Sequence, residues 1–328
     1  TTNSNTQIRQ GIGDDGAVID RGGWLEVVTQ ATMLEGIDFD LTYTPLEHLG
    51  YKLVTAAVSN LCAMGARAEY LTVSIGLSAR FSVEDATALY EGIRRATEHY
   101  RLDLVGGNTS ASLTGLLLSA TAIGTASDEE LILRSGARDK ELLCVTGNLG
   151  AAYLGLQLLE REKRVLQGNG VSRPEINREH AYILQRQLKP EARVDVLNQL
   201  REAGIRPTAM IDVTRGLASA TLHLCQRSGV GARIYLNRIP IASETFRMAE
   251  EMHIDPVVAA LNGGDDFELL FTAPLDKHRE LLTMAGVDVI GHIVPASAGA
   301  ALETPDGGEI RLQAPDWTAR VTEAETAE

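Results

Sequence analysis

Acidic residues beside glycines are the first feature of this 328-residue sequence that could do chemistry. Residues 11–16 read Gly-Ile-Gly-Asp-Asp-Gly, which has the GxGxxG spacing of dinucleotide-binding loops. Such a loop leaves a strand and enters a helix, so that backbone amides meet a bare pyrophosphate, whereas here polar residues precede the segment and strand-like residues follow it. Two carboxylates instead suit a loop that meets phosphate through Mg²⁺, because this hard cation prefers carboxylate oxygens. An ordinary Asp-Gly turn with solvated acids is the alternative.

Three further segments combine glycines with polar side chains at predicted junctions. Residues 103–110 (DLVGGNTS) read as a loop between a helix and a strand, where glycines let backbone amides approach a ligand. Residues 212–216 (DVTRG) place an acid, a hydroxyl and a cation between a strand and a helix, which a simple helix cap also explains. Residues 262–268 (NGGDDFE) lead into a strand. Together the four segments predict one cleft that binds a polyphosphate.

Other classes of protein find no support in the sequence. The segments GxSxG, HExxH and GxxxxGK[ST] are absent, so hydrolase elbows, zincins and P-loop kinases are not indicated. The formal net charge of −14 disfavours nucleic acid as a partner. No apolar run approaches the roughly 20 residues that cross a bilayer, and no signal peptide is visible. Three isolated cysteines favour neither a disulfide framework nor a zinc site, and we expect a cytoplasmic protein.

The elements that must position these segments alternate between helix and strand. Apolar periodicity predicts strands at 25–29, 71–77, 116–123, 142–146, 209–213, 232–236, 267–272 and 287–294. It predicts helices at 46–66, 216–228, 243–253 and 276–285, another helix that begins at Ser82, and another that ends at about residue 162. Residues 161–193 read as a loop with a short helix, and Asp306-Gly307-Gly308 as the turn of a hairpin. This α/β pattern and the chain length predict two domains, 1–135 and 136–328.

A set of motifs along nearly the whole chain carries a family resemblance. In order, these motifs are Gly11–Asp15 (GIGDD), Glu35–Phe39 (EGIDF), Ser59–Ala66 (SNLCAMGA), Gly106–Thr109 (GGNT), Leu133–Ala137 (LRSGA), Asp212–Gly216 (DVTRG) and Gly263–Leu270 (GGDDFELL). From about residue 8 to about residue 317 the chain resembles the thiamine-monophosphate kinase family. The resemblance implies the two-domain α/β fold of the aminoimidazole ribonucleotide synthetase superfamily, a homodimer paired through its N-terminal domains, and transfer of the γ-phosphoryl group of ATP to thiamine monophosphate with several Mg²⁺ ions.

The resemblance also implies roles for individual residues. The expected nucleotide-binding residues are Tyr90, Gly107, Asn108, Arg134, Thr214 and Arg215. The expected substrate-binding residues are Asp38, Asp265 and Trp317, and the expected metal ligands are Asp15, Asn60, Asn108 and Asp212. The family carries His at the place of Asp38 and usually Glu at the place of Asp265.

This sequence differs most in charge from the family pattern at the six positions where the family carries metal-binding aspartates. This sequence has Asp15, Ala31, Asn60, Asn108, Asp212 and Arg215 there. In phosphoryl transfer Mg²⁺ neutralises much of the developing charge, so loss of its ligands predicts weak or absent turnover. Arg215 could contact a phosphate directly. Two alternatives therefore stand beside the kinase: a catalytically silent homodimer that binds a nucleotide or another phosphate, and a relative with a different phosphate acceptor.

Overall fold

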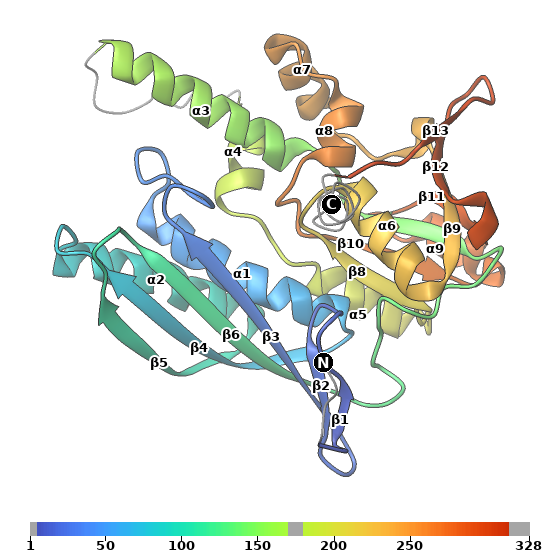
Figure 1. Cartoon of the computed structure of the whole chain (residues 1–328), viewed down its shortest axis with the longest axis horizontal. Coiled ribbons are helices and arrows are strands. Elements are labelled where there is room, and N and C mark those ends of the chain that lie inside the picture. Colours follow the sequence, from blue (N-terminus) through green and yellow to red (C-terminus); the bar gives the residue numbers. More distant parts are fainter. Residues whose placement is uncertain (1–4, 170–179, 315–328) are drawn as a thin grey trace, which may run out of the picture.

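The first half of the chain forms a six-stranded sheet with two helices on one face (Figure 1). The computed structural model describes residues 5–169 and 180–314. The strand order is β1-β2-β3-β6-β4-β5. The elements are β1 (Ile8–Gln10), β2 (Ala17–Asp20), β3 (Leu25–Leu34), α1 (Leu46–Ala63), β4 (Arg67–Leu77), α2 (Val83–Tyr100), β5 (Asp103–Ala111) and β6 (Leu117–Ala126).

Local sequence signals account for these elements. The alternation in β6 buries every second residue against α1, as a half-covered sheet requires. The Ser82 side chain accepts a hydrogen bond from the Asp85 amide, and the Asp85 carboxylate accepts one from the Ser82 amide. The expected capping box therefore starts α2. Gly50 and Gly92 lie where α1 and α2 cross, and a Cβ at Gly92 would collide with the Glu47 carbonyl oxygen. These glycines therefore set how closely the two helices pack.

The second half forms a seven-stranded sheet of order β13-β12-β9-β11-β7-β10-β8, flanked by helices. Its strands are β7 (Leu142–Thr146), β8 (Ala209–Val213), β9 (Val230–Tyr235), β10 (Glu268–Ala273), β11 (Val287–Pro295), β12 (Ala300–Glu303) and β13 (Glu309–Arg311). Its helices are α3 (Ala151–Asn169), α4 (Ala181–Leu188), α5 (Val194–Glu202), α6 (Leu217–Ser228), α7 (Ser243–Met252), α8 (Pro256–Asn262) and α9 (His278–Thr283). The predicted two-domain α/β architecture is confirmed, as is the hairpin at 306–308, which joins β12 to β13.

Some expectations about local structure are wrong. Residues 103–110 belong to the edge strand β5 rather than to a loop, because parallel pairing with β4 outweighs the low strand preference of the glycine pair. The segment after residue 161 continues α3 to Asn169. Two short helices, α5 and α8, were not expected. Their amphipathic faces become visible only from what they pack against.

One apolar core joins the two halves. Helix α1 packs on β3 and β6 with one side and on β8, α4 and α5 with another. The same cluster of buried side chains includes Leu61 of α1, Met210 of β8 and Phe271 of β10. The expected boundary at 135/136 falls in the segment that connects β6 to β7 and stays a prediction. This shared core holds the loops of both halves against each other.

Candidate active site

A pocket of about 340 Å³ lies between the two halves; we call it the arginine pocket. Its lining residues are Asp14, Asp15, Asn60, Arg134, Ile211, Asp212, Thr214, Arg215, Ser219, Ala220 and His223. They come from the loop before β2, the last turns of α1, the connecting segment, the end of β8 and the first turns of α6. Six of the residues expected in the site therefore meet here: Asp15, Asn60, Arg134, Asp212, Thr214 and Arg215.

Arg134 holds the acidic loop in place by contacting the carboxylates of both Asp14 and Asp15. Its Nε donates to Asp15 Oδ2 at 3.0 Å, and its Nη2 donates to Asp15 Oδ1. The Arg134 amide donates to Asp14 Oδ1 at 3.2 Å. Burial, with the charge of Asp15 adding to it, raises the pKa of Asp14 to about 6. The two carboxylates of the loop at 11–16 are thus buried and in contact with a cation, rather than solvated.

Asp212 adds a third carboxyl group at the end of β8, where it is buried. Burial, with the charge of Asp15 adding to it, raises the pKa of Asp212 well above its usual range. Within the described part of the chain, neither Asp212 Oδ2 nor Ser59 Oγ has a hydrogen-bond partner. Buried polar atoms are normally satisfied, and Asp212 lines the arginine pocket, so its Oδ2 can meet a ligand or an ion there.

The arginine pocket offers few oxygen ligands for a divalent ion. Asp15 and Asp212 supply carboxylates and Asn60 a neutral amide oxygen, which suit Mg²⁺. However, the Arg134 guanidinium already contacts both oxygens of Asp15. Ala31 packs against the first apolar core and offers no ligand atom. Among the described residues no cluster of three or more His, Cys, Asp or Glu side chains could hold a metal.

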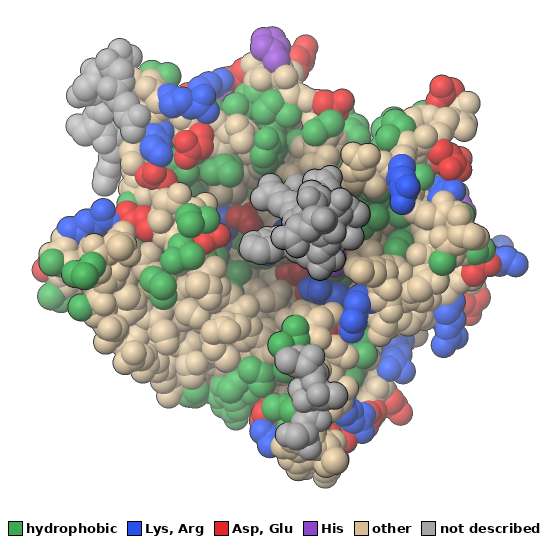
Figure 2. All heavy atoms as spheres, viewed as in Figure 1, with side chains coloured by type: hydrophobic (Ala, Val, Ile, Leu, Met, Phe, Trp, Pro, Cys, Tyr) green, Lys and Arg blue, Asp and Glu red, His purple; other side chains and the backbone are tan. Residues whose placement is uncertain are grey.

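A second cavity, of about 520 Å³, lies next to the arginine pocket; we call it the acidic cavity. It is lined by Gly36, Ile37, Asp38, Phe39, Asp40, Tyr43, Tyr153, Leu156, Gln157, Glu160, Lys163, Gln187, Gly264 and Asp265. Four carboxylates and three aromatic rings thus face one space, with Lys163 as the cation on its wall. In Figure 2, acidic and basic side chains are visible in the hollow between the two halves.

Most carboxylates of the acidic cavity have partners of their own. Lys163 Nζ lies 2.7 Å from Asp40 Oδ2, and the Tyr43 hydroxyl donates to Glu160 Oε1 at 2.7 Å. The Leu34 amide donates to Asp38 Oδ2 at 2.8 Å, which fixes that side chain. The expected substrate residues Asp38 and Asp265 both line this cavity, although 227 positions separate them in the sequence.

One backbone hydrogen bond links the linings of the two cavities at the turn before β10. The Asp265 amide donates to the Thr214 carbonyl oxygen at 3.0 Å, and Thr214 lines the arginine pocket. Asp265 has φ of +60° and Phe267 has φ of +53°. Two left-handed residues this close together produce a sharp turn. Asp265 consequently lies at the junction of both spaces.

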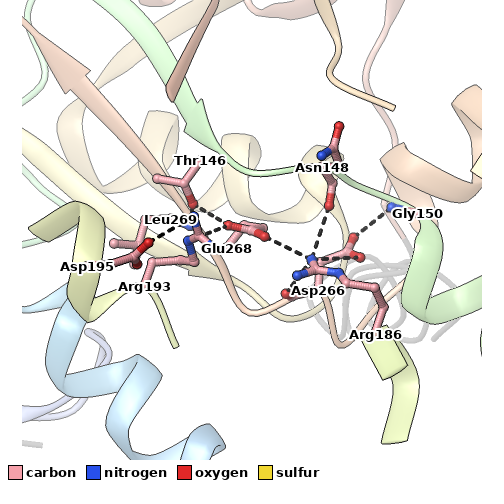
Figure 3. A network of polar contacts seen from close by, with 9 residues as sticks. All are labelled: Thr146, Asn148, Gly150, Arg186, Arg193, Asp195, Asp266, Glu268 and Leu269. Carbon is pink, nitrogen blue, oxygen red and sulfur yellow. Dashed lines mark hydrogen bonds and ion pairs between the residues drawn. The ribbon is translucent and has the colours of Figure 1, made fainter. Parts of the chain in front are cut away.

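A buried ionic network lies behind this turn (Figure 3). Arg186 of α4 donates from Nη2 to the carbonyl oxygens of Asn148 and Asp266, at 3.1 and 3.0 Å, and to Glu268 Oε1 at 2.9 Å. Glu268 Oε2 accepts from Thr146 at 2.5 Å, and Asp266 Oδ2 accepts from the Gly150 amide at 2.9 Å.

Both carboxyl groups of the network are fully buried. Burial raises the pKa of Asp266 to about 7, and it also raises that of Glu268. The network joins the loop after β7 to the turn before β10, so it fixes the wall on which Asp265 stands.

Three expected site residues do not reach either cavity. Gly107 and Asn108 lie in the edge strand β5, four strands away from β2 and thus about 19 Å across the sheet. Tyr90 lies in the middle of α2 and is 39% exposed. Trp317 falls outside the described residues.

Sequence reasoning missed Lys52 and Arg186. Both are cations whose importance comes from burial, which spacing alone does not show. A lone lysine within the apolar stretch 49–58 was the available signal for Lys52, because an apolar helix seldom carries an unpaired charge.

Comparisons with known proteins agree with this architecture. The N-terminal domain of AIR synthase related proteins matches residues 13–126, and the C-terminal domain of the same proteins matches residues 151–301. A thiamine-monophosphate kinase of Aquifex aeolicus is 31% identical over 84% of this chain and 85% of its own length. One of Bacillus subtilis is 32% identical over 84% and 81%.

Solved structures give the same result. The structure described as AaThiL complexed with AMPPCP and TMP has a TM-score of 0.79 and 29% identity, and covers 91% of this chain and 89% of its own. A thiamine-monophosphate kinase of Stenotrophomonas maltophilia has a TM-score of 0.75 and 28% identity, with 92% of each chain covered. In sequence, domain content and fold, the chain belongs to the thiamine-monophosphate kinase family.

Proposed function

We propose that this chain binds ATP in the arginine pocket and thiamine monophosphate in the acidic cavity, and that it transfers the γ-phosphoryl group slowly or not at all. The observation that carries the proposal is the contact between Asp265 and Thr214, at which the two spaces adjoin. Direct phosphoryl transfer needs donor and acceptor in line and in contact. Two adjoining cavities meet that need.

The acidic cavity suits thiamine, whose thiazolium ring is cationic. Phe39, Tyr43 and Tyr153 contribute to its lining, and four carboxylates outnumber the one lysine there. A quaternary thiazolium is attracted both to carboxylates and to aromatic faces. The similarity to a structure described as a complex with AMPPCP and TMP supports the same pair of ligands.

The arginine pocket suits the phosphates of a nucleotide. Arg215 is exposed at the pocket wall, and its planar guanidinium can contact phosphate oxygens in a bidentate way. A single Mg²⁺, entering with ATP and held by Asp15 and Asp212, would neutralise charge on the transferred group. Arg134 competes for Asp15, and Arg215 repels a second ion, so the chain is expected to stabilise the transition state less than a fully metal-loaded site would.

That competition favours a second candidate, a silent homodimer that binds a nucleotide or another phosphate ligand. In this case Arg134 and Arg215 replace the charge of the missing ions, and binding does not depend on divalent metal. The acidic loop is already neutralised by Arg134, which supports this candidate.

A homodimer would explain why Gly107 and Asn108 resemble site residues while lying far from the pocket. The face of the first sheet opposite α1 is free of helices in Figure 1, and Figure 2 shows it almost without charged side chains. Strand β5 is exposed along its whole length. Pairing through this face would bring Asn108 of a second copy toward the arginine pocket.

Calorimetry with ATP, with and without Mg²⁺, followed by a coupled ADP assay with thiamine monophosphate, tests the proposal. Slow, Mg²⁺-dependent ADP release that requires thiamine monophosphate supports the kinase. Binding of ATP that EDTA leaves unchanged, without ADP release, supports the silent candidate. Absence of binding to both ligands would reject the proposed function.

A further inference from the structure

Lys52 is a buried lysine that reaches the wall of the acidic cavity from α1. Its side chain is 6% exposed, although the surrounding helix is apolar. Its Nζ donates to the Gln187 carbonyl oxygen at 3.0 Å and to Asp265 Oδ2 at 2.7 Å. Gln187 and Asp265 both line the acidic cavity, so the ammonium group lies directly behind its surface. A lysine is seldom buried unless its charge is paired, and Asp265 is that pair.

Asp265 links the linings of the two cavities, between which the proposed function transfers a phosphoryl group. Its backbone contacts Thr214 of the arginine pocket, while its carboxylate is 41% exposed at the end of the acidic cavity. A phosphate held at this junction would face that carboxylate at close range. Like charges at such distances repel strongly in a partly enclosed site, so the carboxylate needs a fixed cation beside it.

We propose that Lys52 is a positioning residue that holds Asp265 at the junction and offsets its charge, so that the acidic cavity accepts a phosphorylated cation rather than any cation. The inference rests on the proposed function. Lys52 acts through Asp265 and links α1 of the first half to the turn before β10 in the second. Lys52 contacts Oδ2 of Asp265, and the Asp265 side chain is still 41% exposed.

Selectivity between two ligands tests the role of the charge. Titration calorimetry compares wild type with Lys52→Met for thiamine monophosphate, unphosphorylated thiamine and inorganic phosphate. Removal of the ammonium group should weaken thiamine monophosphate binding about tenfold, since one nearby charge in a partly exposed site is worth about one decade. Thiamine should bind as before or more tightly, because the unpaired carboxylate attracts its cation. A structural role alone would weaken both.

A second-site variant and a matched control complete the design. Asp265→Asn in the Lys52→Met background should restore the preference for the phosphorylated ligand, because it removes the charge that Lys52 offsets. Lys277→Met makes the same change at a lysine that lines neither cavity and pairs with Glu280. It should leave both affinities unchanged.

Urea unfolding without any ligand tests the pair independently of the substrate. Asp265→Asn should lower the urea midpoint of unfolding less in the Lys52→Met background than in wild type, since the two side chains depend on each other. Additive losses would overturn the inference whatever the protein binds. Equal weakening of thiamine and thiamine monophosphate would overturn it as well. The variants could show coupling in unfolding while wild type binds none of the three probes. The proposed function and the role of Lys52 in selectivity would then both fail, but the coupling would still support Lys52 as the residue that holds Asp265.

Discussion

Replacement of Arg186 by methionine should cost this protein a large part of its stability. Arg186 is the cation that faces Glu268, and it contacts two backbone carbonyl oxygens as well (Figure 3). Methionine keeps much of the side-chain volume and removes the charge. Glu268 would then stay fully buried with Thr146 and with Arg193, whose Nε lies 3.4 Å from Oε2.

The expected loss follows from the burial of the remaining charge. Removal of one partner of a buried ion pair costs about 3–5 kcal/mol when the other charge is left uncompensated, and the remaining contact with Arg193 places the expected loss toward the lower end of that range. The free energy of unfolding of a typical protein is about 5–15 kcal/mol, so the loss is a substantial fraction of the total. An ion pair at the protein surface should behave differently. Arg94→Met at a side chain that is 54% exposed, paired with Glu91 and Glu98, should cost far less, because solvent screens exposed ion pairs.

Urea unfolding followed by circular dichroism measures both variants. Glu268→Gln in the Arg186→Met background should regain part of the loss, because a neutral amide is less costly to bury than a lone carboxylate. This second variant keeps the comparison informative if Arg186→Met folds poorly. Equal losses for Arg186→Met and Arg94→Met would refute the reasoning, as would a double variant less stable than Arg186→Met.

Three further changes probe other parts of the structure. Because the pKa of Asp266 is raised to about 7 in the folded state, the folded protein holds a proton that the unfolded chain has lost. Stability should therefore fall by about 3 kcal/mol more in wild type than in Asp266→Asn between pH 5 and pH 7.5, and parallel pH profiles of urea unfolding would contradict this. Gly92→Ala should lower the melting temperature by several degrees, since its Cβ meets the Glu47 carbonyl oxygen of α1; an unchanged melting temperature would count against the close helix crossing. Asn60→Asp with Arg215→Asp should strengthen Mg²⁺ binding at least tenfold in calorimetry, because two carboxylates enter the arginine pocket; no gain would place these residues outside one metal site.

The large elements were predictable because their signals are local. Periodic apolar residues mark α1 and β4, and the Ser82 capping box starts α2 at the expected residue. The strand β5 was not predictable from its own residues, because its glycines and polar side chains acquire strand structure only through pairing with β4. The α5 helix is similar, since its amphipathic face depends on the core it joins.

The candidate site divides in the same way. The family resemblance assigned Asp15, Asn60, Arg134, Asp212 and Arg215 to the expected site, and all five line one pocket of the structure. Asp38 and Asp265 were likewise assigned to one cavity. Burial and partners were not visible, so the sequence did not reveal that Arg134 occupies both oxygens of Asp15.

By itself, the sequence determined which chemical groups are available: acids beside glycines, an arginine between a strand and a helix at 212–216, and the helices and strands that carry them. Only the tertiary structure decided which charges are paired. Lys52 and Asp265 are 213 positions apart, and Arg186 and Glu268 are 82 apart, yet both pairs touch. The physical reason is that the free energy of a charge depends on its distance from solvent and from the opposite charge, and both distances are set by how α1, α4 and the turn before β10 pack together.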